Sequence, residues 1–129
     1  MVQKNSHHKT MNKLNYLKAS YRIAGHFKDI SKEIKSLAQH QNIAGVVQAL
    51  INYLKTLQSI GQEAKLPRYI CYVGMIYSRG NDYVRYMIEN MFVRALGSLE
   101  RRCSAAGWKA IAKCMPKPFT EIYIKQINE

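Results

Sequence analysis

Residues 43–60 read IAGVVQALINYLKTLQSI, and their apolar side chains recur every three or four positions. An α-helix has 3.6 residues per turn, so this spacing places them along one helical face. The apolar positions are Ile43, Val46, Val47, Leu50, Ile51, Leu54, Leu57 and Ile60. Asn42 can cap the start of such a helix, and Gly61 follows its end. The stretch therefore predicts an amphipathic helix and an all-α protein.

The residues before this helix show the same spacing and predict a first helix over 14–37, which can break near Gly25. Its expected buried stripe consists of Leu14, Leu17, Tyr21, Ala24, Phe27, Ile30, Ile34 and Leu37. Three lysines, Lys28, Lys32 and Lys35, fall opposite this stripe. They are expected to face water as a basic ridge.

Residues 68–79, RYICYVGMIYSR, are the hardest segment to assign, because consecutive Tyr, Ile and Val residues favour a strand. A lone strand would leave its backbone hydrogen bonds unsatisfied, since the rest of the chain offers it no pairing partner. We therefore predict a buried third helix here. Pro67 fits its first turn and Gly80 its C-terminal end.

A fourth helix follows, with Asn81 or Asp82 as its cap. Its apolar stripe is Val84, Met87, Ile88, Met91, Phe92, Ala95, Leu96 and Leu99, while Tyr86 and Val93 lie on the reverse side. A break at 105–107 then precedes a short helical turn over 108–115. Pro116 and Pro118 introduce a last helix. Its expected inward residues are Phe119, Ile122, Tyr123 and Ile127.

Together these segments predict an all-α fold, a compact bundle or short solenoid of about five helices, with the second, third and fourth forming its core. Residues 1–13 lack periodicity and are expected to be a flexible N-terminal leader before a single domain over 14–129. The longest apolar stretch, 69–77, is half of what a membrane span needs. No secretory signal is evident, so we expect a cytoplasmic protein with no membrane partner.

The stretch GNDYVRYMIENMFVRALGSL (80–99), followed by MPKPFTEIYIKQI (115–127), resembles a family of short bacterial all-helical proteins catalogued as a domain of unknown function. The matching positions are Gly80, Ile88, Glu89, Asn90, Phe92, Val93, Leu96, Pro116, Tyr123 and Gln126. Helix order and spacing fit this family over about residues 14–127. The resemblance implies an all-helical bacterial protein and provides no catalytic residues, and the present chain is unusually basic for it.

No motif in the chain predicts an enzyme or a cofactor site, because P-loop, GxSxG, HExxH and GxGxxG patterns are all absent. One flank of the first helix combines His26, Asp29 and Glu33 with Arg22, a set that could hold a metal or transfer protons. All four come from one helix, however, so a solvated row of charge pairs is the favoured interpretation. The three cysteines form no CxxC pair and are expected to be buried free thiols.

The net charge of +12 and the nine tyrosines indicate a binding protein. Tyrosine and arginine concentrate at protein interfaces, and positive charge attracts acidic partners. The candidate interface residues around the fourth helix are Arg79, Tyr83, Tyr86, Val93, Arg94 and Arg101, with packing under the last helix as their alternative role. We expect the partner to be another protein with an acidic surface, and one candidate class is a toxin-like effector that the chain inhibits. The alternative is nonspecific nucleic-acid binding through the Lys28, Lys32 and Lys35 ridge and a second ridge at 94–102.

Overall fold

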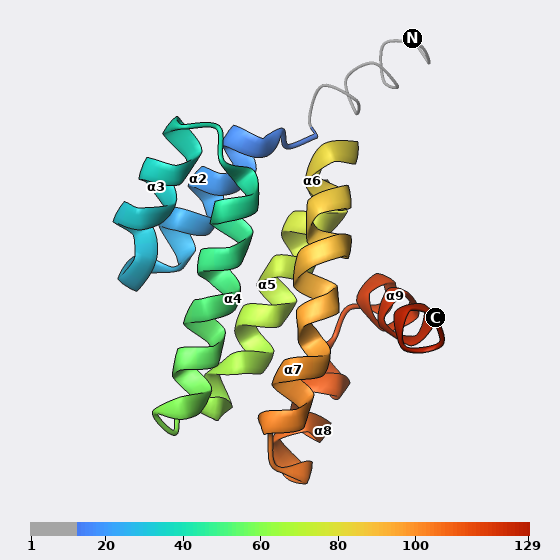
Figure 1. The fold of residues 1–129 in the computed structure, drawn as a ribbon. Coiled ribbons are helices and arrows are strands. Elements are labelled where there is room, and N and C mark those ends of the chain that lie inside the picture. The colour runs from blue at the N-terminus through green and yellow to red at the C-terminus, as the bar shows by residue number, and fades with distance from the viewer. Residues whose placement is uncertain (1–12) are drawn as a thin grey trace, which may run out of the picture.

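A computed structural model describes residues 13–129, and over that range the chain is helical with no β-strand (Figure 1). The predicted leader lies outside the described residues, apart from its last residue. The α-helices are α2 (Tyr16–His26), α3 (Ser31–Gln39), α4 (Ile43–Ser59), α5 (Leu66–Arg79), α6 (Asp82–Met87), α7 (Arg94–Arg102), α8 (Ala105–Cys114) and α9 (Lys117–Ile127). Two 3-10 turns, η1 (Lys28–Ile30) and η2 (Glu63–Lys65), precede α3 and α5, and a π-helical segment, η3 (Ile88–Val93), joins α6 to α7.

The all-α prediction is confirmed, but the predicted number of helices is wrong. Within residues 13–129 there are seven helices rather than about five, when α6, η3 and α7 are taken as one continuous helix. The predicted first helix is two helices, because the backbone of Phe27 leaves the helical region at φ −102° and ψ 76°. The predicted turn near residue 108 is the full helix α8. It begins at Ala105, after Ser104 caps it by accepting from the Gly107 N–H.

The core lies between three central elements, α4, α5 and the continuous α6–α7 helix, which run side by side in Figure 1. Helix α4 contributes eight buried residues, the predicted apolar stripe together with Ala49 and without Ile60. Ile60 is 60% exposed because the helix has already ended at Ser59. The helix predicted for residues 68–79 is confirmed as α5. Its buried positions follow the helical period from Leu66 through Ile70 and Val73 to Tyr77.

Two side chains predicted to point inward on the first helix are instead exposed. Leu17 and Tyr21 are each 38% exposed, while α2 buries Ala19, Ser20, Ile23 and Ala24. The predicted stripe used a single register across residues 14–37, whereas the break at Phe27 gives α2 and α3 different registers. The prediction for α9 is also partly wrong, because Ile127 is 64% exposed in the last helical turn while Phe119 is fully buried.

Caps at two helix starts follow the predicted chemistry. The Asn42 side chain accepts from the Gly45 N–H at 2.8 Å, and the Asn81 side chain accepts from the Val84 N–H at 3.0 Å. The start of the described chain is held beside this second cap. The Leu14 N–H donates to the Arg79 carbonyl, and the Asn81 N–H donates to the Leu14 carbonyl, each at 2.8 Å.

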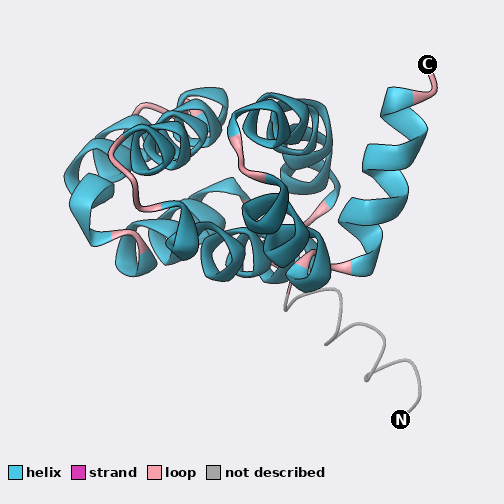
Figure 2. Ribbon diagram, turned by 90° about the horizontal axis from the view of Figure 1, so that it is seen from below, coloured by secondary structure: helices cyan, strands magenta, loops and turns pink. Residues whose placement is uncertain are grey.

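Helix α9 lies at the edge of the molecule and crosses α7 instead of running alongside it (Figures 1 and 2). The linker that leads into α9 rests on α5 at Gly74, where a side-chain methyl group would overlap the ring of Pro116. The glycine therefore allows the linker to approach the core closely. Among residues 13–129, no helix combines the length and the apolar character needed to cross a bilayer.

Candidate binding groove between helices α7 and α9

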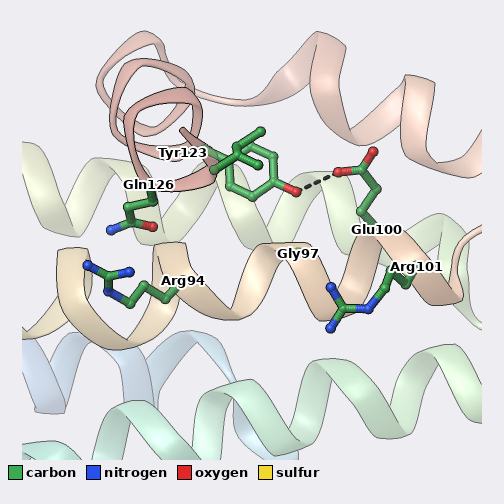
Figure 3. A pocket seen from close by; sticks show the side chains of 7 residues that line it. Arg94, Gly97, Glu100, Arg101, Tyr123 and Gln126 are labelled. Atoms are coloured by element: carbon green, nitrogen blue, oxygen red, sulfur yellow. Dashed lines mark hydrogen bonds between the residues drawn. The ribbon is translucent and has the colours of Figure 1, made fainter. Parts of the chain in front are cut away.

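A cavity of about 490 Å³ opens where α9 crosses α7 (Figure 3). Its lining consists of four residues of α7 and three of α9: Arg94, Gly97, Glu100, Arg101, Tyr123, Gln126 and Ile127. We call this cavity the α7–α9 groove. Arg94, Arg101, Glu100 and Gln126 supply its polar groups, and Tyr123 and Ile127 supply its apolar surface. This is the composition of a site for a charged ligand that also has an apolar part.

Helix α7 supplies the cationic ends of the groove. Arg94 and Arg101 are seven residues apart, so they lie on nearly the same side of the helix and about 10 Å apart along its axis. Both are exposed. Arg94 pairs with Glu129 at 3.2 Å, and Arg101 has no ion-pair partner within residues 13–129.

Gly97 lies between the two arginines, and because it has no side chain it leaves the space of the groove open. A methyl group at Gly97 would lie 3.6 Å from both the Tyr123 hydroxyl and an Arg101 guanidinium nitrogen, so alanine fits and a larger side chain would enter the cavity. The position is therefore a natural place to fill the groove by mutation.

Tyr123 forms the wall of the groove on α9. Its hydroxyl donates to the Glu100 carboxylate at 2.5 Å, and its ring lies 6.0 Å from the Trp108 ring, centroid to centroid. Burial, followed by the hydrogen bond to Glu100, raises the pKa of Tyr123 to about 12, and the Arg101 charge partly opposes this rise. The phenol is therefore neutral at physiological pH and cross-links α9 to α7.

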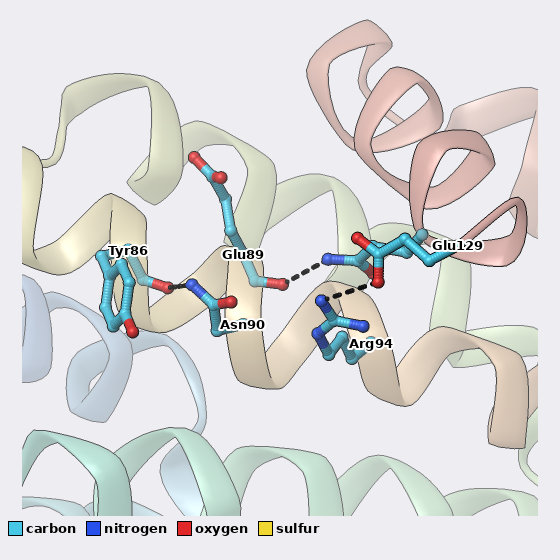
Figure 4. Close-up of polar contacts among 6 residues, drawn as sticks. Tyr86, Glu89, Asn90, Arg94 and Glu129 are labelled. Carbon is cyan, nitrogen blue, oxygen red and sulfur yellow. Dashed lines mark hydrogen bonds and ion pairs between the residues drawn. The ribbon is translucent and has the colours of Figure 1, made fainter.

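Gln126 of α9 is hydrogen-bonded to Glu89 of the π-helical segment, and Figure 4 shows Glu89 and its neighbour Asn90. The Gln126 side-chain N–H donates to the Glu89 carbonyl at 2.9 Å. A π-helical turn shifts the intrahelical hydrogen-bond pattern by one residue, so main-chain groups there can accept side chains from a neighbouring helix. The other end of the amide, Gln126 Oε1, is buried and has no hydrogen-bond partner in the described part of the chain.

A second set of contacts fixes Glu89 from the opposite side. The Tyr77 hydroxyl of α5 donates to the Glu89 carboxylate at 2.5 Å, and the Arg85 guanidinium lies 4.9 Å from the centre of the Tyr77 ring. Burial, and then the bond to Glu89, raises the pKa of Tyr77 to about 12. Glu89 thus joins α5 through its carboxylate and α9 through its carbonyl.

The structure brings together two of the six predicted interface residues, Arg94 and Arg101. Arg79, Tyr83 and Tyr86 are exposed but do not line the groove, and the Tyr86 carbonyl accepts from the Asn90 side chain at 2.8 Å. The prediction that Val93 lies at an exposed interface is wrong. Its side chain is fully buried, because the π-helical segment adds a residue to the turn and rotates Val93 into the core.

The three lysines of the predicted ridge, Lys28, Lys32 and Lys35, are exposed on η1 and α3. In Figure 1 these elements lie on the side of the molecule away from α7, so the lysines do not form one surface with Arg94 and Arg101.

The residues of the predicted flank on the first helix are divided by the break at Phe27. Asp29 lies in η1 and accepts from the Tyr53 hydroxyl at 2.7 Å, whereas Glu33 belongs to α3. Residues 13–129 contain no group of three or more His, Cys, Asp or Glu side chains that could hold a metal ion.

The cysteines are free, but the prediction that all are buried is wrong. Cys71 and Cys103 are half-buried, and Cys114 is exposed near the end of α8. Burial, followed by a hydrogen bond to Glu63, raises the pKa of Cys103 to about 11, so this thiol is protonated at neutral pH.

Sequence patterns missed the α9 side of the groove. Tyr123 was predicted to point inward and Gln126 was named only as a matching position of the family, since neither residue type at that spacing signals a site. A glycine at position 97, inside a helix that otherwise keeps its period, is the one local signal of a close approach.

Comparison with known proteins gives a family but no function. No curated protein and no solved structure shows a significant match to the chain. A family model described as a domain of unknown function, DUF7674, matches residues 21–129, which include the second half of α2 and every later helix. The match covers well over half of the chain, and the protein therefore belongs to the DUF7674 family.

Proposed function

We propose that the protein is a non-enzymatic protein-binding module, and that the α7–α9 groove receives an acidic segment of its partner. The observation that carries this proposal is the placement of Arg94 and Arg101 at the two ends of one groove, with Gly97 between them. Arginine is suited to such a role because its planar guanidinium forms paired hydrogen bonds with a carboxylate.

The geometry of the groove favours a particular spacing of acidic groups in the partner. Two carboxylates about 10 Å apart match a polyproline II segment with acids at positions i and i+3, or a helix with acids at i and i+7. Between them, an apolar side chain would contact Tyr123 and Ile127, of which Ile127 is 64% exposed. Protein interfaces commonly have an apolar centre surrounded by a polar rim, and the exposed Ile127 beside the two arginines fits that arrangement.

The charge of the whole chain supports an acidic partner. A net charge of +12 attracts an acidic protein over long range and speeds the encounter, while the groove contacts provide specificity. We propose a regulatory or inhibitory role in the cytoplasm, with an acidic toxin-like effector as the partner class.

Site-specific photo-crosslinking in extract from the source organism tests this proposal. A photoreactive residue at position 127, where the native isoleucine lines the groove and is 64% exposed, should capture a protein, and mass spectrometry should locate the crosslink in a segment with Asp or Glu at one of the two spacings above. The Arg101→Glu variant should lower the yield about tenfold or more, because a like charge then faces the acidic segment.

Arg102→Glu is the matched control, since Arg102 is the exposed neighbour of Arg101 and does not line the groove. Its crosslinking yield should stay within about twofold of the unchanged protein, as expected for a rim charge. Equal yields from the two variants, or a crosslink in a segment without acidic residues, would refute the assignment of the groove.

A further inference from the structure

A cluster of aromatic side chains lies where α2 meets α5, away from the α7–α9 groove. His26 stacks flat on Tyr72, with ring centroids 3.8 Å apart and an interplanar angle of 2°. Tyr69 meets the His26 ring edge-on at 5.9 Å, and the buried Phe27 meets it edge-on at 5.2 Å. The Tyr72 hydroxyl donates to the Arg22 carbonyl at 3.0 Å, which fixes the orientation of its ring. The cluster is therefore a packed platform of aromatic rings.

We infer that the face of the His26 ring opposite Tyr72 is accessible to solvent. Tyr72 covers one face, and Tyr69 and Phe27 make edge contacts, yet the residue is exposed. A flat aromatic ring with a free outer face is the element on which single-stranded nucleic acids stack their bases. The stack of Tyr72 and His26 can thus be extended by one more planar ring.

Positive charges surround the platform. Arg22 lies one helical turn before His26 on α2, and Arg68 lies one turn before Tyr72 on α5, so each shares a helix face with a member of the stack. Both arginines are exposed, and neither forms an ion pair within residues 13–129. Burial and the Arg68 charge both lower the pKa of His26, which agrees with the position of Arg68 close to the His26 ring.

A recess of about 180 Å³ adjoins the platform at the start of α5. It is lined by Ala64, Lys65, Arg68 and Tyr69. Tyr69 belongs to both features, since its ring also meets the edge of His26. A cationic recess beside a free aromatic face is an arrangement that suits a phosphate next to a stacked base.

We propose that this surface binds single-stranded nucleic acid, with one base on the free face of His26 and the adjoining phosphate between Lys65 and Arg68. In a duplex the faces of the bases are stacked on one another, and an acidic peptide has no planar base to stack on His26. The free face of the ring therefore favours a single strand over a duplex or an acidic peptide. This binding site is independent of the α7–α9 groove. It also differs from the predicted Lys28, Lys32 and Lys35 ridge.

Fluorescence anisotropy with a labelled twelve-residue oligothymidylate tests the proposal on the full chain. At about 50 mM salt the single strand should bind, and the logarithm of its affinity should fall linearly with the logarithm of the salt concentration. His26→Ala should weaken binding about tenfold or more by removing the stacking ring. His26→Trp should keep the affinity, which separates loss of stacking from damage to the fold. Arg68→Glu should also weaken binding about tenfold or more through loss of a phosphate contact.

Matched controls are His40→Ala, which removes an exposed histidine at the end of α3, and Lys35→Glu on the lysine ridge. Both should leave the affinity within about twofold, whereas loss on Lys35→Glu with no change on His26→Ala would overturn the proposal. It would also be overturned if the single strand did not bind at about 50 mM salt, or if a duplex, a glutamate-rich peptide or thymidine monophosphate bound as tightly.

Discussion

Helices α4 and α9 are held in the molecule in different ways. Helix α4 buries eight residues, whereas α9 buries only Phe119 fully and is otherwise attached by half-buried side chains and the hydrogen bonds of Tyr123 and Gln126. Apolar burial is nondirectional and strong in sum, while each hydrogen bond adds about 1 kcal/mol. The comparison indicates that α4 carries the stability of the fold and that α9 is a separately attached wall of the groove.

The largest expected effect comes from the centre of α4. Leu54 is completely buried, so Leu54→Ala should lower the free energy of unfolding by about 2–5 kcal/mol through lost burial and a new cavity. Denaturant unfolding followed by circular dichroism measures the change. A loss below about 1 kcal/mol would mean that α4 is not the main source of stability.

A smaller effect is expected where the α8–α9 linker touches the core. Gly74→Ala places a methyl group against Pro116, and overpacking of this kind costs about 1–3 kcal/mol. Gly25→Ala in α2 is the matched control, because a methyl group there meets no atom within 4 Å. Alanine favours helix over glycine, so thermal melts should show the control unchanged or stabilised. Equal melting temperatures for the two variants would rule out a tight approach of the linker.

The hydrogen bond between Gln126 and the Glu89 carbonyl should make a still smaller contribution. Gln126→Ala should cost about 1 kcal/mol in denaturant unfolding, the typical value of one such bond. Lys125→Ala, an exposed neighbour on the same helix, should cost less than about 0.5 kcal/mol. If both variants behaved alike, the link between α9 and the π-helical segment would not contribute to stability.

The smallest effect concerns the pH dependence at His26. Burial, followed by the Arg68 charge, lowers the pKa of His26 below 6.5 in the folded protein. Just below pH 6.5 the unfolded chain therefore binds more protons than the folded one, so this residue's contribution to stability falls as the pH decreases through that range. An NMR titration should find the folded midpoint below 6.5, and Arg68→Ala should raise it. A midpoint at or above 6.5 would contradict this environment.

The parts of the fold that depend on local chemistry could be predicted from the sequence. The α4 stripe, the Asn42 cap and the α5 helix over residues 68–79 follow from spacing and from the hydrogen-bonding needs of the backbone. Each of these depends on residues within a few turns of one another. Periodicity is therefore sufficient for them.

The groove could not be predicted in the same way, because it depends on contacts between distant residues. Gln126 reaches Glu89, and Tyr123 reaches Glu100, across separations that no local pattern encodes. The π-helical turn that buries Val93 is also invisible to an analysis that assumes a constant period. Of the residues that line the groove, only Arg94 and Arg101 could be predicted as interface residues from the sequence, because both lie on one helix.

Amide hydrogen exchange, with and without the partner captured at the groove, tests the account most directly. In the free protein we predict that α9 amides exchange through local opening, faster than those of α4, which should exchange near the free energy of global unfolding. Adding the partner should slow exchange in residues 94–101 and 119–127. Free α9 as protected as α4, or added protection confined to other helices, would contradict the account.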